Sequence, residues 1–310
     1  MAKLLNLIQN EWMKIWQKKS SWITIIVFIA IIAGMLTLVK VAENTFMSDE
    51  TIAEDEKQLQ EIEAQLADPS LTEAEREDLE VEQEMIIVSI ESSEPSTREG
   101  MVIETYGMMA LVTLMTIIVS SGIVSAEFSQ GTIKMLLARP VKRWKILLSK
   151  YITVLLYSLL LTVILFGVTY ITSSILFPKV LEDTVTFSGG EVAANKVLGK
   201  ALYMMFLGWI NTVVISTLAF MIGTIFRSTS LAIGISIFLY FTGNTIVLFL
   251  TKYDFAKYIL FANTDLTQYE TGYVLIDGLS MSFSATVIAV YAVLFLLLSF
   301  LSFIKRDVAA

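Results

Sequence analysis

The side chains that could perform chemistry are few in kind. Among the 310 residues there is no histidine and no cysteine. Histidine is the commonest general base and zinc ligand, and cysteine is the usual thiol nucleophile. Their absence excludes Ser-His-Asp hydrolysis, Cys-His proteolysis, disulfides and zinc chemistry. We therefore expect no catalytic residue and no metal site in this chain.

The sequence also lacks a phosphate-binding loop. No stretch matches the Walker A pattern G-x-x-x-x-G-K-[ST], because Gly199-Lys200 is followed by Ala201 and has no glycine upstream at the required spacing. We expect the chain to bind no ATP by that route. Its formal net charge of -8 argues against nucleic acid as the main partner.

Residues 127–150 concentrate the features of a protein-docking segment. Gly131 should end the preceding helix, Thr132 should cap a short new helix, and Pro140 should terminate it. Three apolar residues and two basic neighbours would form its surface: Ile133, Leu136, Leu137, Lys134 and Arg139. A short, capped and partly apolar helix that cannot span a membrane is typical of a docking element.

Six stretches without any charged residue must position this segment. They are residues 21–39, 105–126, 151–177, 201–226, 229–250 and 281–304. About 20 apolar residues, at about 1.5 Å each, cross a hydrocarbon core about 30 Å thick. Hydrophobic residues make up 55% of the chain and charged residues 17%. We predict an all-α integral membrane protein with six transmembrane helices.

Basic residues are unevenly divided between the two sides of the predicted membrane. The segments on the same side as both termini hold 13 lysines and arginines, whereas the two short loops opposite hold 5. The positive-inside rule therefore places the N-terminus and the tail at residues 305–310 in the cytoplasm.

Two regions outside the spans have helical patterns of their own. Residues 1–20 predict a cytoplasmic amphipathic helix at the membrane interface, which either anchors the chain passively or moves with a partner. Residues 40–104 contain 20 acidic and 4 basic residues. They predict an extracytoplasmic acidic helical hairpin, with a capping box at Thr72 and Glu75. This hairpin is either a solvated spacer or a means of recruiting a cationic partner.

The remaining loops on the extracytoplasmic side are shorter. Residues 178–200 contain Gly189-Gly190 and indicate a simple connector. Residues 251–280 form an outer loop rich in tyrosine and phenylalanine. This composition favours short interfacial or re-entrant helices, although an ordinary aromatic belt would give a similar pattern.

Uncharged polar residues within the spans could line a path through the membrane. The candidates are Asn211, Asn244, Thr245 and Ser121. Hydrogen bonding between helices, at about 0.6 kcal/mol for each bond, is the alternative role for them. The spans contain no ionisable Asp, Glu, Lys or Arg, which argues against a proton-driven carrier. Energy for active transport would then come from another chain.

The run E-F-S-Q-G-T-I-K-M-L-L-A-R-P-V-K-R, from Glu127 to Arg143, resembles the signature of the ABC-2 type transporter permeases. These are membrane subunits of ABC exporters whose ATPase is a separate polypeptide. The positions that match are Glu127, Gly131, Thr132, Leu136, Leu137, Pro140, Arg143 and Lys150. The resemblance implies that 127–150 is a coupling-helix loop, whose ATPase contacts would also include Ile133 and Arg139. Arg227 would form a second cytoplasmic contact.

The resemblance further implies a permease subunit of an ATP-driven exporter in the bacterial plasma membrane. It would pair with a second copy or a paralogue and with ABC ATPase subunits that bind ATP and Mg, so that this chain itself would be no enzyme. Apolar spans fit an amphiphilic or hydrophobic substrate, such as a peptide antibiotic, a drug or a lipid-like molecule. The alternative is a non-transporting membrane sensor or scaffold whose acidic hairpin binds a ligand. A neighbouring ATPase gene would favour the exporter, and a neighbouring kinase gene alone would favour the sensor.

Overall fold

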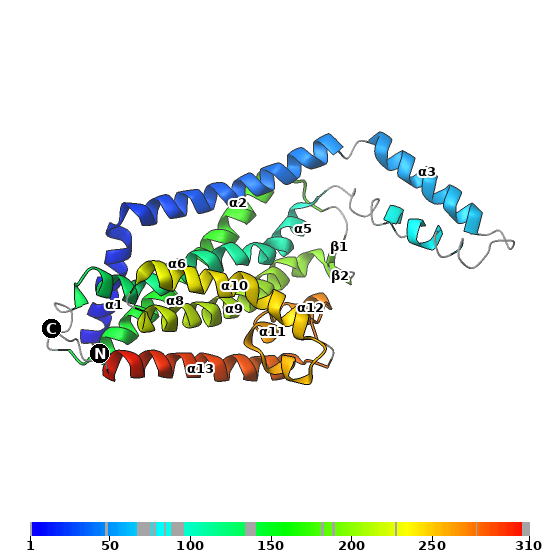
Figure 1. Ribbon diagram of the computed structural model, residues 1–310. Coiled ribbons are helices and arrows are strands. Elements are labelled where there is room, and N and C mark those ends of the chain that lie inside the picture. Colours follow the sequence, from blue (N-terminus) through cyan, green and yellow to red (C-terminus); the bar gives the residue numbers. More distant parts are fainter. Residues whose placement is uncertain are drawn as a thin grey trace.

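A computed structural model describes most of the chain (Figure 1). The described residues are 2–46, 49–66, 76, 79–83, 85–87, 96–133, 141–180, 183–187, 190–226, 228–276 and 278–305. The predicted capping box at Thr72 and Glu75 lies outside them.

Helices dominate the described residues. In chain order the elements are α1 (Ala2–Gln17), α2 (Lys19–Phe46), α3 (Asp49–Leu66), α5 (Arg98–Ile103), the 3-10 helix η1 (Glu104–Met108), α6 (Met109–Ser129), α8 (Arg143–Leu176), β1 (Thr184–Phe187), β2 (Gly190–Ala193), η2 (Ala194–Lys196), α9 (Val197–Ile225), α10 (Thr229–Leu250), η3 (Asp254–Tyr258), α11 (Leu260–Asn263), α12 (Gln268–Thr271) and α13 (Met281–Lys305).

Within the described residues, six helical segments are long and apolar enough to cross a membrane. They are Lys19–Thr45, Arg98–Ser129, Arg143–Leu176, Ala194–Ile225, Thr229–Leu250 and Met281–Lys305. Each contains, or nearly contains, one of the charge-free stretches of the sequence. The predicted helical architecture with six candidate spans is therefore confirmed.

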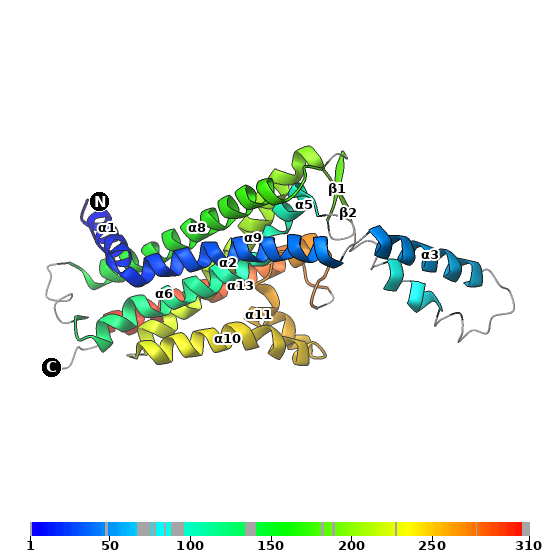
Figure 2. The ribbon, with the colours of Figure 1, turned by 90° about the horizontal axis from the view of Figure 1, so that it is seen from above.

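The long helices form an elongated bundle with two distinct ends (Figures 1 and 2). At one end, here called the termini end, lie α1, the end of α6, the start of α8 and the end of α13. At the other, here called the distal end, lie β1, β2, α11 and α12. In the most hydrophobic 18-residue stretch of α9, 67% is buried inside the chain, whereas the corresponding stretches of α2 and α10 are 22% and 17% buried. α9 is thus the central helix of the bundle.

Close packing of α6 against α9 depends on one glycine. A Cβ atom on Gly223 of α9 would lie 2.2 Å from the carbonyl oxygen of Ser121 in α6. Because no real Cβ contact is that short, only glycine allows the two backbones to approach so closely. At the distal end, Gly243 of α10 accommodates the ring of Phe261 in the same way.

In the acidic region, residues 40–104, α3 projects from the distal end of the bundle (Figures 1 and 2). α3 and the helical residues 79–83 and 85–87 run side by side in both views. Ile62 of α3 and Ile86 are both buried, with 4% and 9% of their surfaces exposed. This burial is what the seam of the predicted hairpin requires.

The prediction that residues 178–200 form a simple connector is wrong. β1 and β2 pair as an antiparallel hairpin in which Val185 lies opposite Val192. Val185 and Phe187 alternate with threonines, and both are buried against Ile103 and Val197. Strand-like alternation over four residues was the available signal, and packing against α5 and α9 stabilises it.

Candidate functional site

Four charged side chains meet at the termini end of the bundle. The Nζ atom of Lys150, in α8, lies 2.7 Å from Oε2 of Glu11 in α1 and 3.2 Å from Oε1 of Glu127 in α6. Lys14 Nζ lies 3.0 Å from Oε1 of both carboxylates. Two lysines and two glutamates therefore form a neutral cluster that joins three helices, here called the charged cluster.

Three of the four side chains in the charged cluster are largely shielded from solvent, whereas Lys14 is 46% exposed. The side chain of Lys150 is only 1% exposed, whereas those of Glu11 and Glu127 are 8% and 14% exposed. Burial of one unpaired charge would be strongly unfavourable, but each charge here has an opposite charge within hydrogen-bonding distance. Burial lowers the pKa of Lys14, but Glu11 and Glu127 outweigh this effect and raise it above its ordinary value.

The charged cluster also contacts the start of the predicted docking segment. α6 ends at Ser129, and Gly131 adopts a left-handed conformation with φ of 71°. This confirms that Gly131 breaks the helix, because such a conformation favours glycine. The hydroxyl of Thr132 donates to Oε2 of Glu127 at 2.5 Å. Glu127 thereby links the charged cluster to the chain that leaves α6.

The rest of the predicted docking helix is not described by the structure. Leu136, Leu137, Arg139 and Pro140 lie outside the described residues, and so does Arg227. Ile133 is described, and only 4% of its surface is exposed, because it packs with Phe220 and Phe303 inside the chain. The expectation that Ile133 contributes to an exposed docking surface is therefore wrong.

Arg143 binds the end of another span. Its Nη1 atom donates to the carbonyl oxygen of Ile304, in the last turn of α13, at 3.2 Å. The last four carbonyls of a helix lack partners within the helix and carry partial negative charge, so a guanidinium is favourable there. Arg143 thus connects the loop before α8 to the end of α13.

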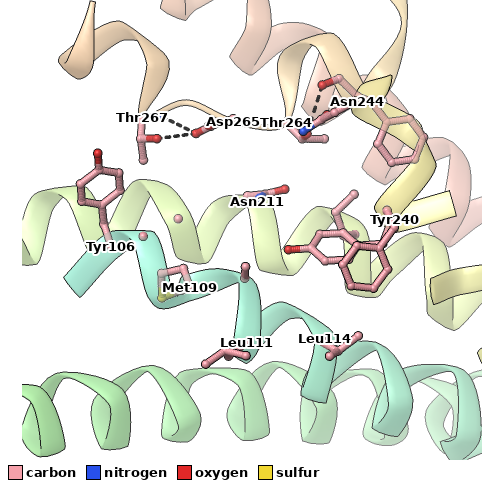
Figure 3. A pocket seen from close by; sticks show the side chains of 16 residues that line it. Tyr106, Met109, Leu111, Leu114, Asn211, Tyr240, Asn244, Thr264, Asp265 and Thr267 are labelled. Atoms are coloured by element: carbon pink, nitrogen blue, oxygen red, sulfur yellow. Dashed lines mark hydrogen bonds between the residues drawn. The ribbon is translucent and has the colours of Figure 1, made fainter. Parts of the chain in front are cut away.

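A second feature is a cavity of about 430 Å³ in the distal half of the bundle. Figure 3 shows its lining, which comes from η1, α6, α9, α10 and the segment 261–267. Most of the lining is apolar or aromatic, and it includes Tyr106, Met109, Leu111, Leu114, Tyr240, Phe241 and Phe261. The polar groups come from Asn211, Asn244 and Asp265, together with Thr264 and Thr267.

The structure brings two of the four predicted path-lining residues together. Asn211 of α9 and Asn244 of α10 both line the cavity. Thr245 is exposed on α10 but does not line it. Ser121 is buried where α6 packs on α9, and its hydroxyl donates to the carbonyl oxygen of Ile117 at 2.7 Å. Because this hydrogen bond stays within α6, the structure shows Ser121 neither lining the cavity nor donating to another helix.

Comparison with known proteins places the chain in a family. Residues 82–309 match a family model described as a protein of unknown function, DUF2705. The chain belongs to the DUF2705 family. It is 38% identical to the Bacillus subtilis uncharacterized protein YhcI over 316 aligned residues, which cover 99% of this chain and all of that protein. It is also 31% identical to the B. subtilis uncharacterized membrane protein YdbK over 209 residues, covering 66% of this chain and 80% of YdbK.

Membership of the DUF2705 family agrees with the fold. The six apolar helices and the relative named as a membrane protein together identify a multi-pass membrane protein. The DUF2705 match includes Glu127, Lys150 and the whole cavity lining, whereas Glu11 and Lys14 precede it. The alignment with YhcI extends over nearly the full chain.

Sequence reasoning identified only part of either site in this DUF2705 protein. It singled out Glu127 and Lys150 as positions of one loop, and the structure pairs Glu127 with both Lys150 and Lys14. It missed Glu11, although a carboxylate between Ile8 and Ile15 on the packed face of a helix was an available signal. It also missed Asp265 in the cavity, because the sequence does not reveal how segment 261–267 folds back.

Proposed function

We propose that this chain is the permease subunit of an ATP-driven exporter of the ABC-2 type. In this proposal it acts as a dimer in the bacterial plasma membrane, with both termini in the cytoplasm. A separate ATPase chain binds and hydrolyses ATP and docks on the loop 127–150. The substrate is an amphiphilic or hydrophobic molecule.

The observation that carries the proposal is the charged cluster beside this loop. Glu127 lies in the last turn of α6 and Lys150 lies near the start of α8, so the cluster ties together the helices on either side of the loop. Glu11 and Lys14 add the N-terminal helix α1 to the same contact. Separating buried ion-pair partners costs about 3–5 kcal/mol. A push on the loop would therefore move α1, α6 and α8 together rather than one at a time.

The arrangement of the spans agrees with this mechanism. α9 packs against α6 and α13 in the middle of the bundle, and the cavity lies between α6, α9 and α10 toward the distal end. Force that enters at the termini end would thus reach helices that line the cavity. The six charge-free stretches at the centre of the spans hold no ionisable residue that could couple transport to a proton gradient.

Copurification tests the proposal. A double variant, Leu136→Asp with Leu137→Asp, would place two carboxylates in an apolar docking contact, where truncation of a single hot-spot residue already costs about 2 kcal/mol or more. We expect this variant to enter the membrane normally, to lose its ATPase in affinity purification and to lose export. The matched control is Val81→Asp with Met85→Asp, two apolar residues that are 51% and 63% exposed in the acidic region. It should keep the ATPase.

The opposite result would favour the sensor or scaffold. A double Asp variant that still holds an ATPase and still exports would refute the docking assignment. Purification of the unmodified chain with a kinase, and with no ATPase, would refute the exporter itself.

A further inference from the structure

The cavity combines an apolar body with two acceptor groups, the Oδ1 atom of Asn211 and the carboxylate of Asp265. Figure 3 shows Asn211 between Met109 on one side and Asp265 on the other, with the hydroxyl of Tyr240 pointing into the space. The Oδ1 atom of Asn211 is buried and has no hydrogen-bond partner. A buried acceptor without a partner is unfavourable by about 1–3 kcal/mol. A ligand that donates a hydrogen bond to this atom would remove that cost.

Asp265 supplies negative charge to the same space. Its Oδ1 atom accepts two hydrogen bonds from Thr267, one from the backbone N–H at 2.9 Å and one from the hydroxyl at 2.5 Å. Among the described residues, two other carboxylates at the distal end have basic partners: Glu270 pairs with Lys200, and Glu99 pairs with Arg98. Asp265 has no such ion pair within the described part of the chain.

The rest of the lining selects the kind of ligand. It contains no lysine and no arginine, so an anion would meet the like charge of Asp265 with no cationic side chain in the lining to offset it. The aromatic rings of Phe241 and Phe261 can cover an apolar body, and tyrosine faces attract cations. A volume of about 430 Å³ lies in the usual range for small-molecule sites, roughly 300–1,000 Å³.

We propose that this cavity binds a cationic amphiphile. The protonated amine lies beside Asp265 and donates to Oδ1 of Asn211, while the apolar body lies against Phe241, Phe261 and Leu114. Residues 40–104 carry 20 acidic against 4 basic residues, and α3 within this range projects from the distal end. This charge attracts cations and raises their concentration near the cavity. The assignment deepens the proposed function, on which it rests only for identifying this ligand with the exported substrate.

A titration with three probes of equal chain length tests the assignment. The full-length chain is placed in phosphatidylcholine nanodiscs, and octylammonium, octan-1-ol and octanoate are titrated in a calorimeter, with empty nanodiscs as the blank. We expect saturable binding of octylammonium at one site per chain. Octan-1-ol should bind about tenfold or more weakly than octylammonium, because it lacks the charge that pairs with Asp265, and octanoate should not bind.

Matched variants locate the site. Asp265→Asn keeps an acceptor for Thr267 but removes the charge, and it should weaken octylammonium binding about tenfold. Asn211→Leu keeps the volume and removes the acceptor, and it should weaken binding about fivefold. Asp254→Asn, an exposed carboxylate of η3 outside the cavity lining, should leave the affinity unchanged.

Two results would overturn the assignment. If octan-1-ol binds as tightly as octylammonium, the cavity takes lipid chains regardless of charge. If Asp265→Asn and Asp254→Asn have equal effects, the cation is held elsewhere. The unmodified chain already separates the probes, so the test does not depend on the folding of any variant. The titration does not involve the ATPase. If the chain binds octylammonium but purifies from cells without an ATPase, the exporter proposal is refuted and the assignment of a cationic ligand to the cavity stands.

Discussion

Lys150 places a positive charge where almost no water can reach it. Its side chain is 1% exposed, and it contacts one carboxylate from α1 and another from α6. Removal of this lysine would leave Glu11 and Glu127 close together with only Lys14 between them, and Lys14 is 46% exposed. The stability of the termini end should therefore depend more on Lys150 than on either of its partners.

Neutralisation of Lys150 should destabilise the chain strongly. We expect Lys150→Met to lower the free energy of unfolding by about 3 kcal/mol or more, because it leaves uncompensated buried charge. Glu127→Ala should destabilise less, because Lys150 keeps Glu11; it should reduce activity while the complex stays assembled. Thermal unfolding of the detergent-solubilised chain measures the first effect, and copurification with an activity assay measures the second.

A charge-balanced double variant distinguishes lost charge pairing from lost packing. Lys150→Met combined with Glu11→Gln leaves Glu127 paired with Lys14, so it should recover part of the stability lost in Lys150→Met alone. Lys142→Met, an exposed lysine at the start of α8, should have little effect. Equal destabilisation by the single and double variants would show that the methylene groups of Lys150, and not its charge, stabilise the site.

At the scale of elements, the contact between α6 and α9 decides how the bundle closes. Gly223 sits against the backbone of Ser121, and a Cβ atom there would approach the Ser121 carbonyl oxygen to 2.2 Å. Gly234 lies in the interior of another span, α10, with no atom within 4 Å of its hypothetical Cβ. The two glycines thus have the same residue type and helical setting but opposite surroundings.

The two glycines should respond oppositely to alanine. Gly223→Ala should destabilise the chain by about 1–3 kcal/mol, because the helices must separate to admit the methyl group. Gly234→Ala should be neutral or should stabilise by up to about 1 kcal/mol, because alanine favours a helix over glycine. Melting temperatures of the two variants check this, and similar values for both would contradict the close approach of α6 and α9.

The sequence could predict the spans because freedom from charge over about 20 residues is a local property. Their ends were less predictable. The uncharged stretch 151–177 suggested a later start for α8, yet the helix begins at Arg143, since charged residues can extend a helix beyond the apolar core. The burial of Glu11 and the closure of segment 261–267 over Asn211 depend on contacts between distant residues. The place of Glu11 on the apolar face of its helix was a local signal of burial, but no local pattern indicates its partners or the closure of segment 261–267.

At the scale of the whole molecule, both sites are arranged along one axis. The charged cluster lies at the termini end and the cavity lies toward the distal end, with α6 and α9 running between them (Figure 1). The proposed mechanism requires the termini end to face the cytoplasm, where ATP is available. The 13 basic residues on that side, against 5 in the two short loops on the other, predict this orientation.

Single cysteines can determine the orientation, since the native chain contains none. Gln130, just after α6 at the termini end, and Asp183, just before β1 at the distal end, are both exposed. We expect Asp183→Cys to react with a membrane-impermeant maleimide in intact cells, and Gln130→Cys to react only after the membrane is opened. The unmodified chain gives the background, and labelling of both variants in opened membranes shows that each thiol is accessible. Reaction of Gln130→Cys in sealed cells would place the charged cluster outside the cytoplasm, and an ATPase could then not act through it.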